Sequence, residues 1–502
     1  MKSKSKLTNA GTILPAVIGG AVYVSLAIVA FDFTFDDTFI SMRYAKNLAE
    51  YGEIVWNQGE QVKVEGYSNF LWVVLLVLPF RFLPVEPLLT AKLLSFTFAL
   101  TAVFVCSFLT YRMSGRWLPT LFATLLMVLS MPFVVWGVSG MEASLYVFLI
   151  LLAIYLHLVE DEHRLLFVTP LVLFCISITR TEGIVFYFSA VLARTLLFLF
   201  KGDMRYSWRN RRWIYWNGLF VALFSSYLTW KYLYYGSLIS LPMQLKQASG
   251  LEGVHYVRDL LLRLRPFVPL AVIGIIFTAR QPSRLYPVLA LSLYFAAIAF
   301  SNPIQGIEFR LLIAAIPLVY LLAVLGVDDL SRRMKPPWRV ITLVILLTGL
   351  VLWVTGNPLK YPSRLKSMTS DSTVLQQIHI PMGKWLDRLS KSQGRFTVAV
   401  ADAGAIVFYS NCDAIDFFGL NDVEFAKYGF TPERLLKKSP EFIVLKSSSP
   451  TDFKGTDTQY GELSDLIYTN PEFQKFYEVR KIWTSVKPFF YCLWLFQRRD
   501  AA

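Results

Sequence analysis

Apolar segments long enough to cross a membrane recur through most of this chain, and this feature constrains its fold more than any other. Segments such as 11–31 and 88–111 contain hardly any charged side chains. A helix needs about 20 apolar residues to cross the hydrocarbon core of a bilayer. Because 55% of the 502 residues are hydrophobic, a soluble enzyme is excluded and we predict a polytopic α-helical membrane protein.

Charged residues between the apolar segments predict how the chain threads the membrane. Lys and Arg gather in short loops, most densely at 201–212, as the positive-inside rule expects of cytoplasmic loops. The net charge of +14 is therefore assigned to topology and not to nucleic-acid binding. The segment 69–80 is too short to cross, so we expect it to be re-entrant or interfacial.

This reasoning predicts eleven spans and a cytoplasmic N-terminus. The first apolar segment is too long for a signal peptide and is expected to remain as an uncleaved span. The predicted spans are 11–31, 88–111, 117–136, 144–158, 165–178, a sixth that ends at Lys201, 213–234, 265–278, 286–300, 310–327 and 340–355.

The composition becomes that of a soluble protein after the last span. We therefore predict two domains: a transmembrane domain at 1–356 and an extracytoplasmic α/β domain at 357–502. RFTVAVA (395–401) is expected to be a strand and AGAIVFYS (403–410) a short helix, and two late aromatic runs are typical of antiparallel strands. Cys412 and Cys492 leave open a disulfide in this domain.

Two adjacent carboxylates, Asp36 and Asp37, follow the first span directly. The apolar periodicity from Phe39 onward predicts a short amphipathic helix on the membrane surface, closed by Gly52. Carboxylates at a helix N-terminus gain from the helix dipole. Such a group can accept the proton of a sugar hydroxyl, which is general-base catalysis. The structural alternative, a helix cap with a first-turn acid, stays open.

In the predicted topology the external loops collect ionisable groups at the ends of the spans. A transferase that uses a lipid-phosphate donor needs a base, cations for the phosphate and a groove for the lipid tail. Arg180, Lys246 and Arg310 are the best candidates for the cations, since arginine binds phosphate in a bidentate way. Each charge taken alone could instead be a snorkelling anchor.

The sequence DDTFISMRYAKNL (36–48), followed by GEQVKVEGYSNFLW (59–72), resembles the GT-C class of membrane glycosyltransferases. It is most similar to the subgroup of the mycobacterial terminal arabinofuranosyltransferase. The resemblance continues along nearly the whole chain, in VSGMEASLY, RTEG, KYLYYGSLISLPMQLK, GIEFRLLIAAIPL and DAGAIVFYSNCDAIDFFGLND.

This resemblance implies a GT-C-like fold, with the segment 69–80 as a juxtamembrane helix, in the cytoplasmic (inner) membrane of a bacterium. It also implies an inverting transfer on the external face, from a polyprenyl-phosphate-linked sugar to an envelope glycan, lipid or protein, with Asp36 as the base and Asp37 in support. The predicted substrate-binding residues are Arg43, Tyr44, Glu65, Tyr67, Asn69, Glu142, Arg180, Glu182, Lys246, Glu308 and Arg310.

The C-terminal domain offers a second set of polar residues within the stretch that carries the resemblance. Asp402, Asp416, Asn421 and Asp422 are expected either to bind the acceptor or to cap helices and turns. The histidines and cysteines lack metal-ligand spacing. Two adjacent aspartates could ligate a divalent metal, but no further carboxylate is close in sequence, so we predict catalysis without metal or cofactor.

Two functions of other classes remain as alternatives. The first is a transporter for lipid-linked sugars, although the inverted repeats common in transporters are not found in this sequence. The second is a non-catalytic scaffold of an envelope-assembly complex, in which the C-terminal domain would bind partners.

Overall fold

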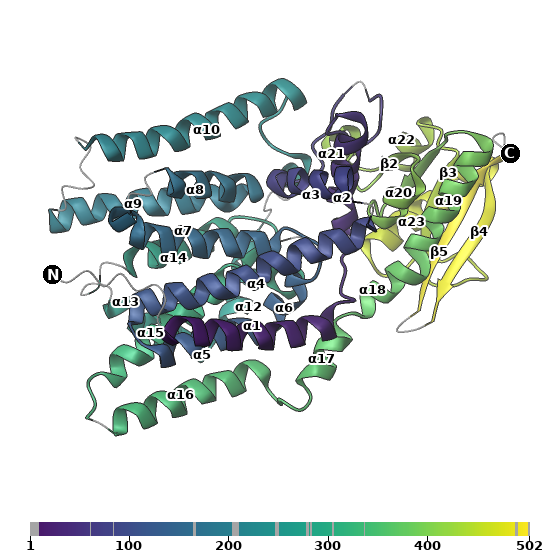
Figure 1. The fold of residues 1–502 in the computed structure, drawn as a ribbon. Coiled ribbons are helices and arrows are strands. Elements are labelled where there is room, and N and C mark those ends of the chain that lie inside the picture. Colours follow the sequence, from purple (N-terminus) through teal and green to yellow (C-terminus); the bar gives the residue numbers. More distant parts are fainter. Residues whose placement is uncertain are drawn as a thin grey trace.

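The chain folds into a helical bundle with a smaller sheet-containing part at one end (Figure 1). The computed structural model describes residues 10–60, 62–83, 85–163, 167–202, 210–245, 250–277, 281, 284–303, 306–335, 337–486 and 490–499. The first helix begins at the bundle end far from the sheet, and the described C-terminal residues lie at the opposite extreme of the molecule.

Each of the eleven apolar segments predicted as spans forms helical structure. Among the residues that the structure describes, five segments of helix qualify as spans by length and composition, namely 11–30, 87–114, 143–160, 181–200 and 338–355, and one bent pair would make a sixth. The protein is therefore a multi-pass membrane protein, and the count of eleven stays a prediction. The helices are α1 (Ala10–Ala30), α4 (Pro87–Ser114), α5 (Trp117–Val128), α6 (Met131–Gly137), α7 (Ala143–His163), α8 (Val168–Thr179), α9 (Ile184–Lys201), α10 (Arg211–Tyr235), α13 (Phe267–Ile276), α14 (Leu285–Ala299), α15 (Ala315–Ser331) and α16 (Trp338–Thr355).

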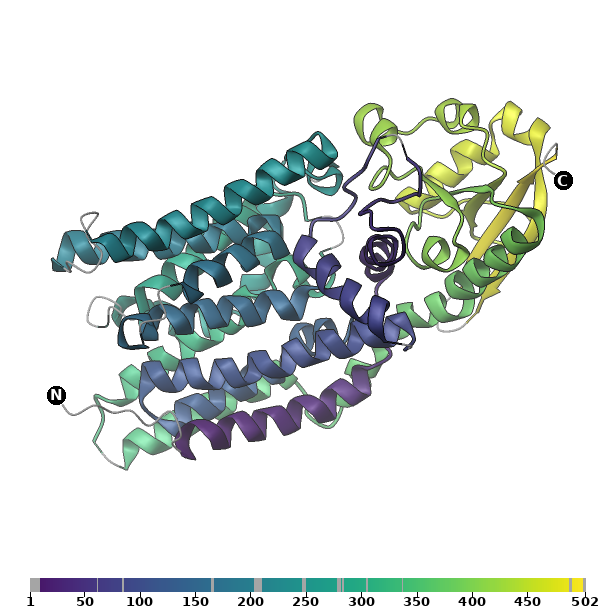
Figure 2. The same cartoon turned by 45° about the horizontal axis from the view of Figure 1, so that its top comes forward.

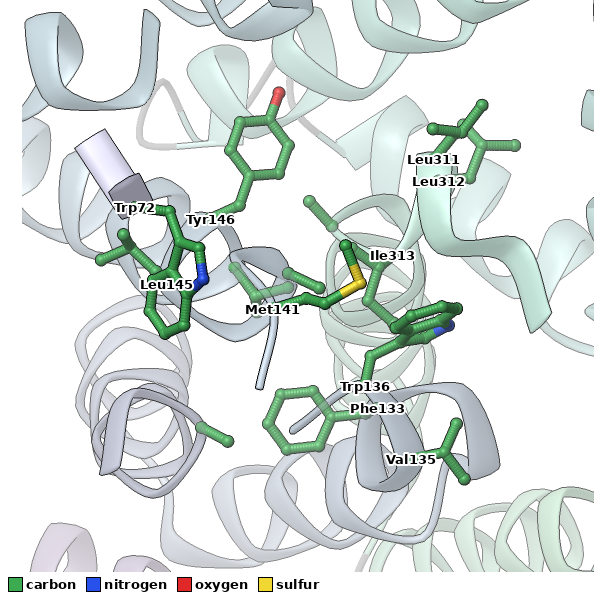
Figure 3. Packing of buried hydrophobic residues seen from close by; sticks show 14 of the residues in the cluster. Trp72, Phe133, Val135, Trp136, Met141, Leu145, Tyr146, Leu311, Leu312 and Ile313 are labelled. Atoms are coloured by element: carbon green, nitrogen blue, oxygen red, sulfur yellow. The ribbon is translucent and has the colours of Figure 1, made fainter. Parts of the chain in front are cut away.

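The bent pair, α5 and α6, turns by 64° at a short break. Pro132 stands in the first turn of α6, where its missing N–H leaves no donor unsatisfied, so a new helix can begin there. Figure 3 shows the result: Phe133 and Trp136 of α6 pack beside Met141, and the Met141 side chain points toward Trp136 and Ile313. This apolar layer supports the loops at the sheet-side end of the bundle.

Short helices lie at that end, as predicted for the segment that begins at Asn69. They are α2 (Asp37–Tyr51), α3 (Phe70–Phe82), η1 (Thr181–Gly183), α11 (Leu241–Leu245), α12 (Glu252–Arg263) and η5 (Ile307–Leu312). The predicted end of α2 is confirmed, because Gly52 adopts φ +76° and its N–H bonds to the carbonyl of Leu48.

The predicted amphipathic helix is present as α2, but its polar face is largely buried. Its polar residues Arg43 and Asn47 are as buried as its apolar ones. The helix packs against α3 on one side and against a helix of the C-terminal part on the other, and Figures 1 and 2 both show it between the bundle and the sheet. The amphipathic periodicity predicts a polar face that is exposed to water, whereas this face packs against the C-terminal part.

The C-terminal part contains one five-stranded sheet in the order β2-β1-β3-β5-β4. β1 pairs in parallel with β2 and β3, while β5 runs antiparallel to β3 and β4, which confirms the strands predicted from the sequence. The strands are β1 (Thr397–Val400), β2 (Asp413–Asp416), β3 (Phe442–Ser447), β4 (Tyr477–Ser485) and β5 (Tyr491–Arg498). The helices are α17 (Tyr361–Ser367), α18 (Ser370–Val374), η6 (Leu375–His379), α19 (Ile380–Gln393), α20 (Ala405–Ser410), α21 (Val423–Tyr428), α22 (Pro432–Lys437), α23 (Gln459–Tyr468) and α24 (Pro471–Phe476).

The two cysteines of this part are free thiols, so no disulfide joins Cys412 to Cys492. Both are buried. Their sulfurs lie within hydrogen-bonding distance of the carbonyl oxygens of Ser410 and Ser449 respectively. They act as small buried side chains.

Candidate functional site

A cavity of about 190 Å³ lies where the loop after α1, the bundle and the C-terminal part meet. It brings together residues from segments far apart in the sequence. Its lining consists of Asp37, Ile40, Ser41, Gly66, Tyr67, Ser68, Asn69, Met141, Pro242, Leu245, Arg310, Phe418, Leu420 and Gln459.

Asp37 and Arg310 form the charged pair of this cavity. Asp37 is the first residue of α2, and its carboxylate accepts a hydrogen bond from the guanidinium of Arg310 at 2.8 Å. The guanidinium carbon also lies 5.5 Å from the ring centre of Trp136, so α6 supports it from below. The structure thus places a carboxylate and a cation on one wall of the cavity.

Glu142 holds the cations of the site in place. One of its oxygens accepts from Arg180 at 2.8 Å and from Arg310 at 3.4 Å, and the other accepts from the amide of Asn69 at 2.9 Å. Burial alone would raise the pKa of Glu142, but Arg310, Arg180 and Asn69 lower it to about 2. Arg180 also donates to Glu182 at 2.5 Å, so these five predicted residues do form one network.

The backbone beside Arg310 is strained. Glu308 and Phe309 adopt φ values of +46° and +54°, in the left-handed region that residues other than glycine rarely occupy. The Glu308 carboxylate accepts from Arg263 at 2.9 Å. Strain of this kind persists only where surrounding contacts enforce it, and it is common at functional sites.

Asp36 lies outside the lining of the cavity and is bound to the C-terminal part. Its two carboxylate oxygens accept hydrogen bonds from the backbone N–H groups of Gly404 and Ala405, each at 2.9 Å. Asp36 makes no capping bond to its own helix, α2, but satisfies donors at the start of α20. A Cβ atom on Gly404 would lie 2.3 Å from Asp36, so only glycine permits this approach.

A buried histidine joins the same contact. His379 lies 3.6 Å from Asp36 and 3.7 Å from Asp402, and Asp402 accepts from the hydroxyl of Tyr491 at 2.8 Å. Burial alone would lower the pKa of His379, but the two carboxylates raise it above its ordinary value. Burial likewise raises the pKa of Asp402. This histidine was not singled out from the sequence, because its partners are far away along the chain.

Arg43 and Tyr44 connect the first loop to the C-terminal part. The guanidinium of Arg43 donates to the carbonyl oxygens of Trp56, Val407 and Cys412 at 2.7–2.8 Å. The Tyr44 hydroxyl accepts from the N–H of Gly66 and lies 3.1 Å from the side-chain oxygen of Asn421. Both residues hold the walls of the cavity together and do not line it.

The predicted acceptor residues make contacts within the C-terminal part as well. Asp416 is fully buried and accepts from Asn421 at 2.9 Å, and burial raises its pKa to about 7. Asp422 caps α21 and pairs with Lys438 at 3.0 Å. In the same region Leu420 and Gln459 line the cavity, although no sequence pattern singled them out.

The remaining predicted residues divide between the cavity and its edge. Tyr67 lines the cavity and shares a hydrogen bond with Tyr235 at 3.0 Å. Glu65 forms a buried ion pair with Lys231 at 2.8 Å. Burial raises the pKa of Glu65 to about 7, even though Lys231 acts in the opposite direction. Lys246 lies outside the described residues.

Within the described part of the chain, no group of three or more His, Cys, Asp or Glu side chains is placed to hold a metal ion. The prediction of catalysis without metal or cofactor stays a prediction. What the cavity does supply is a carboxylate, a cation, an amide and a phenol next to a strained loop.

Comparisons with known proteins address the fold. A family model described as "Domain of unknown function (DUF8728)" matches residues 371–499, and no curated protein matches the chain. The crystal structure of ArnT from Cupriavidus metallidurans in the apo state matches with a TM-score of 0.63 at 11% identity, over 95% of this chain and 97% of that one. The structure of the same protein bound to undecaprenyl phosphate matches with a TM-score of 0.60 at 9% identity, over the same shares. This chain therefore has the ArnT-like GT-C fold that its sequence predicts, with a helical membrane domain followed by a small sheet-containing part.

Proposed function

We propose that this protein is a membrane glycosyltransferase that moves a sugar from a polyprenyl-phosphate donor to a hydroxyl group of an envelope glycan, lipid or protein. The observation that carries the proposal is the cavity in which Asp37 and Arg310 face the same space, at the bundle end that holds the C-terminal part. The fold likeness to ArnT, one of whose structures contains undecaprenyl phosphate, supports the class of donor.

The reaction needs a base that acts on the acceptor hydroxyl and a cation that acts on the donor phosphate. The hydroxyl oxygen of the acceptor attacks the anomeric carbon, and the bond from that carbon to the phosphate oxygen breaks. The polyprenyl phosphate leaves with the electron pair, and the hydroxyl proton passes to the carboxylate. Attack from the side opposite the phosphate inverts the configuration at the anomeric carbon. Arg310 exchanges its bond to Asp37 for the donor phosphate, so it supplies positive charge for the departing phosphate and leaves the carboxylate free to act as the base.

We assign the base to Asp37 and a positioning role to Asp36, which reverses the order that the family resemblance implies. Asp37 lines the cavity, whereas both oxygens of Asp36 already accept backbone hydrogen bonds from Gly404 and Ala405. A carboxylate held in this way anchors the start of α2 to the C-terminal part. Asp36 would then fix where Asp37 stands.

The substrates are assigned only by class. The arabinofuranosyltransferase-like subgroup and the sugar itself remain predictions from the resemblance. For the acceptor, we favour Gln459 and the backbone around Leu420 over Asp402, Asp416 and Asp422, since only the former line the cavity. Catalysis on the external face likewise rests on the charge pattern of the loops.

The test is lipid mass spectrometry of cells that express the wild-type protein, Asp37→Asn, Asp36→Asn or Asp32→Asn. Asp32 is the matched control, because it lies in the same loop but is exposed and pairs with Lys366. We expect one polyprenyl-phosphate sugar to accumulate in Asp37→Asn while Asp32→Asn resembles the wild type. An unchanged lipid profile and unchanged envelope glycans in Asp37→Asn would contradict the enzyme proposal and favour a scaffold.

A further inference from the structure

A second cavity, of about 310 Å³, lies at the same end of the bundle but has a different lining. It is formed by the end of α12, the start of α6 and α13, the first turns of α15, and the chain from the end of α16 to α17. The residues are Ser130, Met131, Pro132, Leu260, Leu262, Arg263, Leu264, Arg265, Phe267, Ile316, Tyr320, Trp353, Val354, Gly356 and Arg364. Its volume falls at the lower end of the usual range for ligand sites, about 300–1,000 Å³.

The charged side chains that line this cavity, called the arginine cavity below, are all positive. Its described lining includes three arginines and no carboxylate. Arg263 is partly neutralised by Glu308 at 2.9 Å. Among the described residues, neither Arg265 nor Arg364 has an ion-pair partner: Arg265 stacks 4.7 Å above the ring of Trp353, and Arg364 donates to the carbonyl of Thr355 at 3.3 Å. The cavity is therefore complementary to an anion.

The floor of the same cavity is apolar. Leu264, Phe267 and Ile316 are each less than 5% exposed, and Tyr320 closes the space beside them. The arginines, in contrast, are exposed at its rim. A ligand that satisfies both surfaces has to be amphiphilic, with an anionic group at the rim and an apolar portion below it.

The position of the cavity fits a membrane lipid. It opens at the C-terminal end of α16, a candidate membrane span, beside Trp353. Tryptophan is enriched at the level of the lipid headgroups. The loops of this bundle end are those that the charge pattern assigns to the outside, where the positive-inside rule disfavours clustered arginines. Membrane topology therefore does not explain the arginines of this cavity.

We propose that the arginine cavity binds the phosphate group of a membrane lipid, at a site separate from the cavity of Asp37. Guanidinium groups bind phosphate oxygens in a bidentate way and at close range. The two cavities share one short element: Glu308 of η5 holds Arg263, and Arg310 of η5 lines the other cavity. A lipid phosphate bound here thus lies next to the strained loop that carries Arg310.

The experiment measures lipid binding by the purified full-length protein in an uncharged maltoside detergent, by native mass spectrometry over a lipid titration. The probes are a polyprenyl monophosphate, a phosphatidylglycerol and, as the uncharged comparison, a polyprenol. The variants are Arg265→Gln and Arg364→Gln. Arg258→Gln is the matched control, because Arg258 is an exposed arginine of α12 that pairs with Asp259 and does not line the cavity.

We expect Arg265→Gln and Arg364→Gln each to weaken the binding of a phosphate lipid at least about tenfold, the effect of losing one charge-assisted hydrogen bond, and Arg258→Gln to leave it unchanged. If the variants lose affinity for the polyprenyl phosphate alone, the proposal is supported with an isoprenoid phosphate as the ligand. If they lose affinity equally for both phosphate lipids, it is supported with a phospholipid as the ligand. Unchanged binding, equal loss in Arg258→Gln, or equally tight binding of the polyprenol would overturn it. Binding is measured without turnover, so the result does not depend on the proposed activity.

Discussion

Replacing Glu142 by Gln should destabilise the whole sheet-side end of the bundle. The carboxylate is buried and serves Arg180, Arg310 and Asn69 at once. A pKa that falls from 4.5 to about 2 on folding corresponds to about 3 kcal/mol, at about 1.4 kcal/mol for each tenfold change. Breaking a buried ion pair by removing one partner costs about 3–5 kcal/mol. The two estimates agree, and we expect a loss of about 3 kcal/mol at neutral pH.

The loss should depend on pH in a defined direction. Because the pKa of Glu142 is lower in the folded than in the unfolded protein, its contribution is fully present above about 4.5 and disappears as the pH falls toward 2. The difference in stability between the wild type and Glu142→Gln should therefore be constant from pH 6 to 8 and shrink below pH 4.5.

The free energy of unfolding is measured by SDS titration in mixed micelles across this pH range. Glu50→Gln serves as the control, since Glu50 is an exposed glutamate of α2, and it should change stability by less than about 0.5 kcal/mol. A change below about 1 kcal/mol in Glu142→Gln, or a difference that grows in acid, would refute the reasoning, because the arginines would then be held without this carboxylate.

Two further predictions concern the contact between the first loop and the C-terminal part. Gly404→Ala should abolish transfer and increase proteolysis between the two parts, because its Cβ would collide with Asp36, whereas Gly218→Ala, in open space on α10, should behave as the wild type. Cys412 and Cys492 should resist alkylation by a maleimide at pH 8 until the protein is unfolded, because both are buried and burial raises the pKa of each thiol to about 11; equal mobility on reducing and non-reducing gels would confirm that they are not bonded.

The features predicted well from the sequence depend on neighbours along the chain. Apolar segments form helices because a backbone in lipid must satisfy its own hydrogen bonds. Gly52 ends α2 because glycine readily adopts a positive φ. The strands β1, β4 and β5 are recognisable by short β-branched and aromatic runs. In each case the information lies within a few residues.

The arrangement of the site was predicted less well, because it depends on residues distant in sequence. The sequence singled out the aspartate pair but did not predict the different contacts of its two members. Asp36 bonds to Gly404, 368 residues later, and Asp37 bonds to Arg310, 273 residues later. No sequence pattern predicts the left-handed backbone of Glu308, because such conformations are expected at glycine. The arginine cavity gathers residues from α6 to α17, and none of them forms a motif.

The bonds of Arg43 impose an order on the biosynthesis of the protein. Its acceptor on Val407 is 364 residues downstream. At a synthesis rate of about 5–20 residues per second, about 20 to 70 s separate the two positions. Throughout that interval the loop that holds Asp37 lacks the surface against which it is fixed. A nascent or truncated chain would thus be present in the membrane with the first loop unanchored, and a segment synthesised hundreds of residues later completes the walls of the cavity.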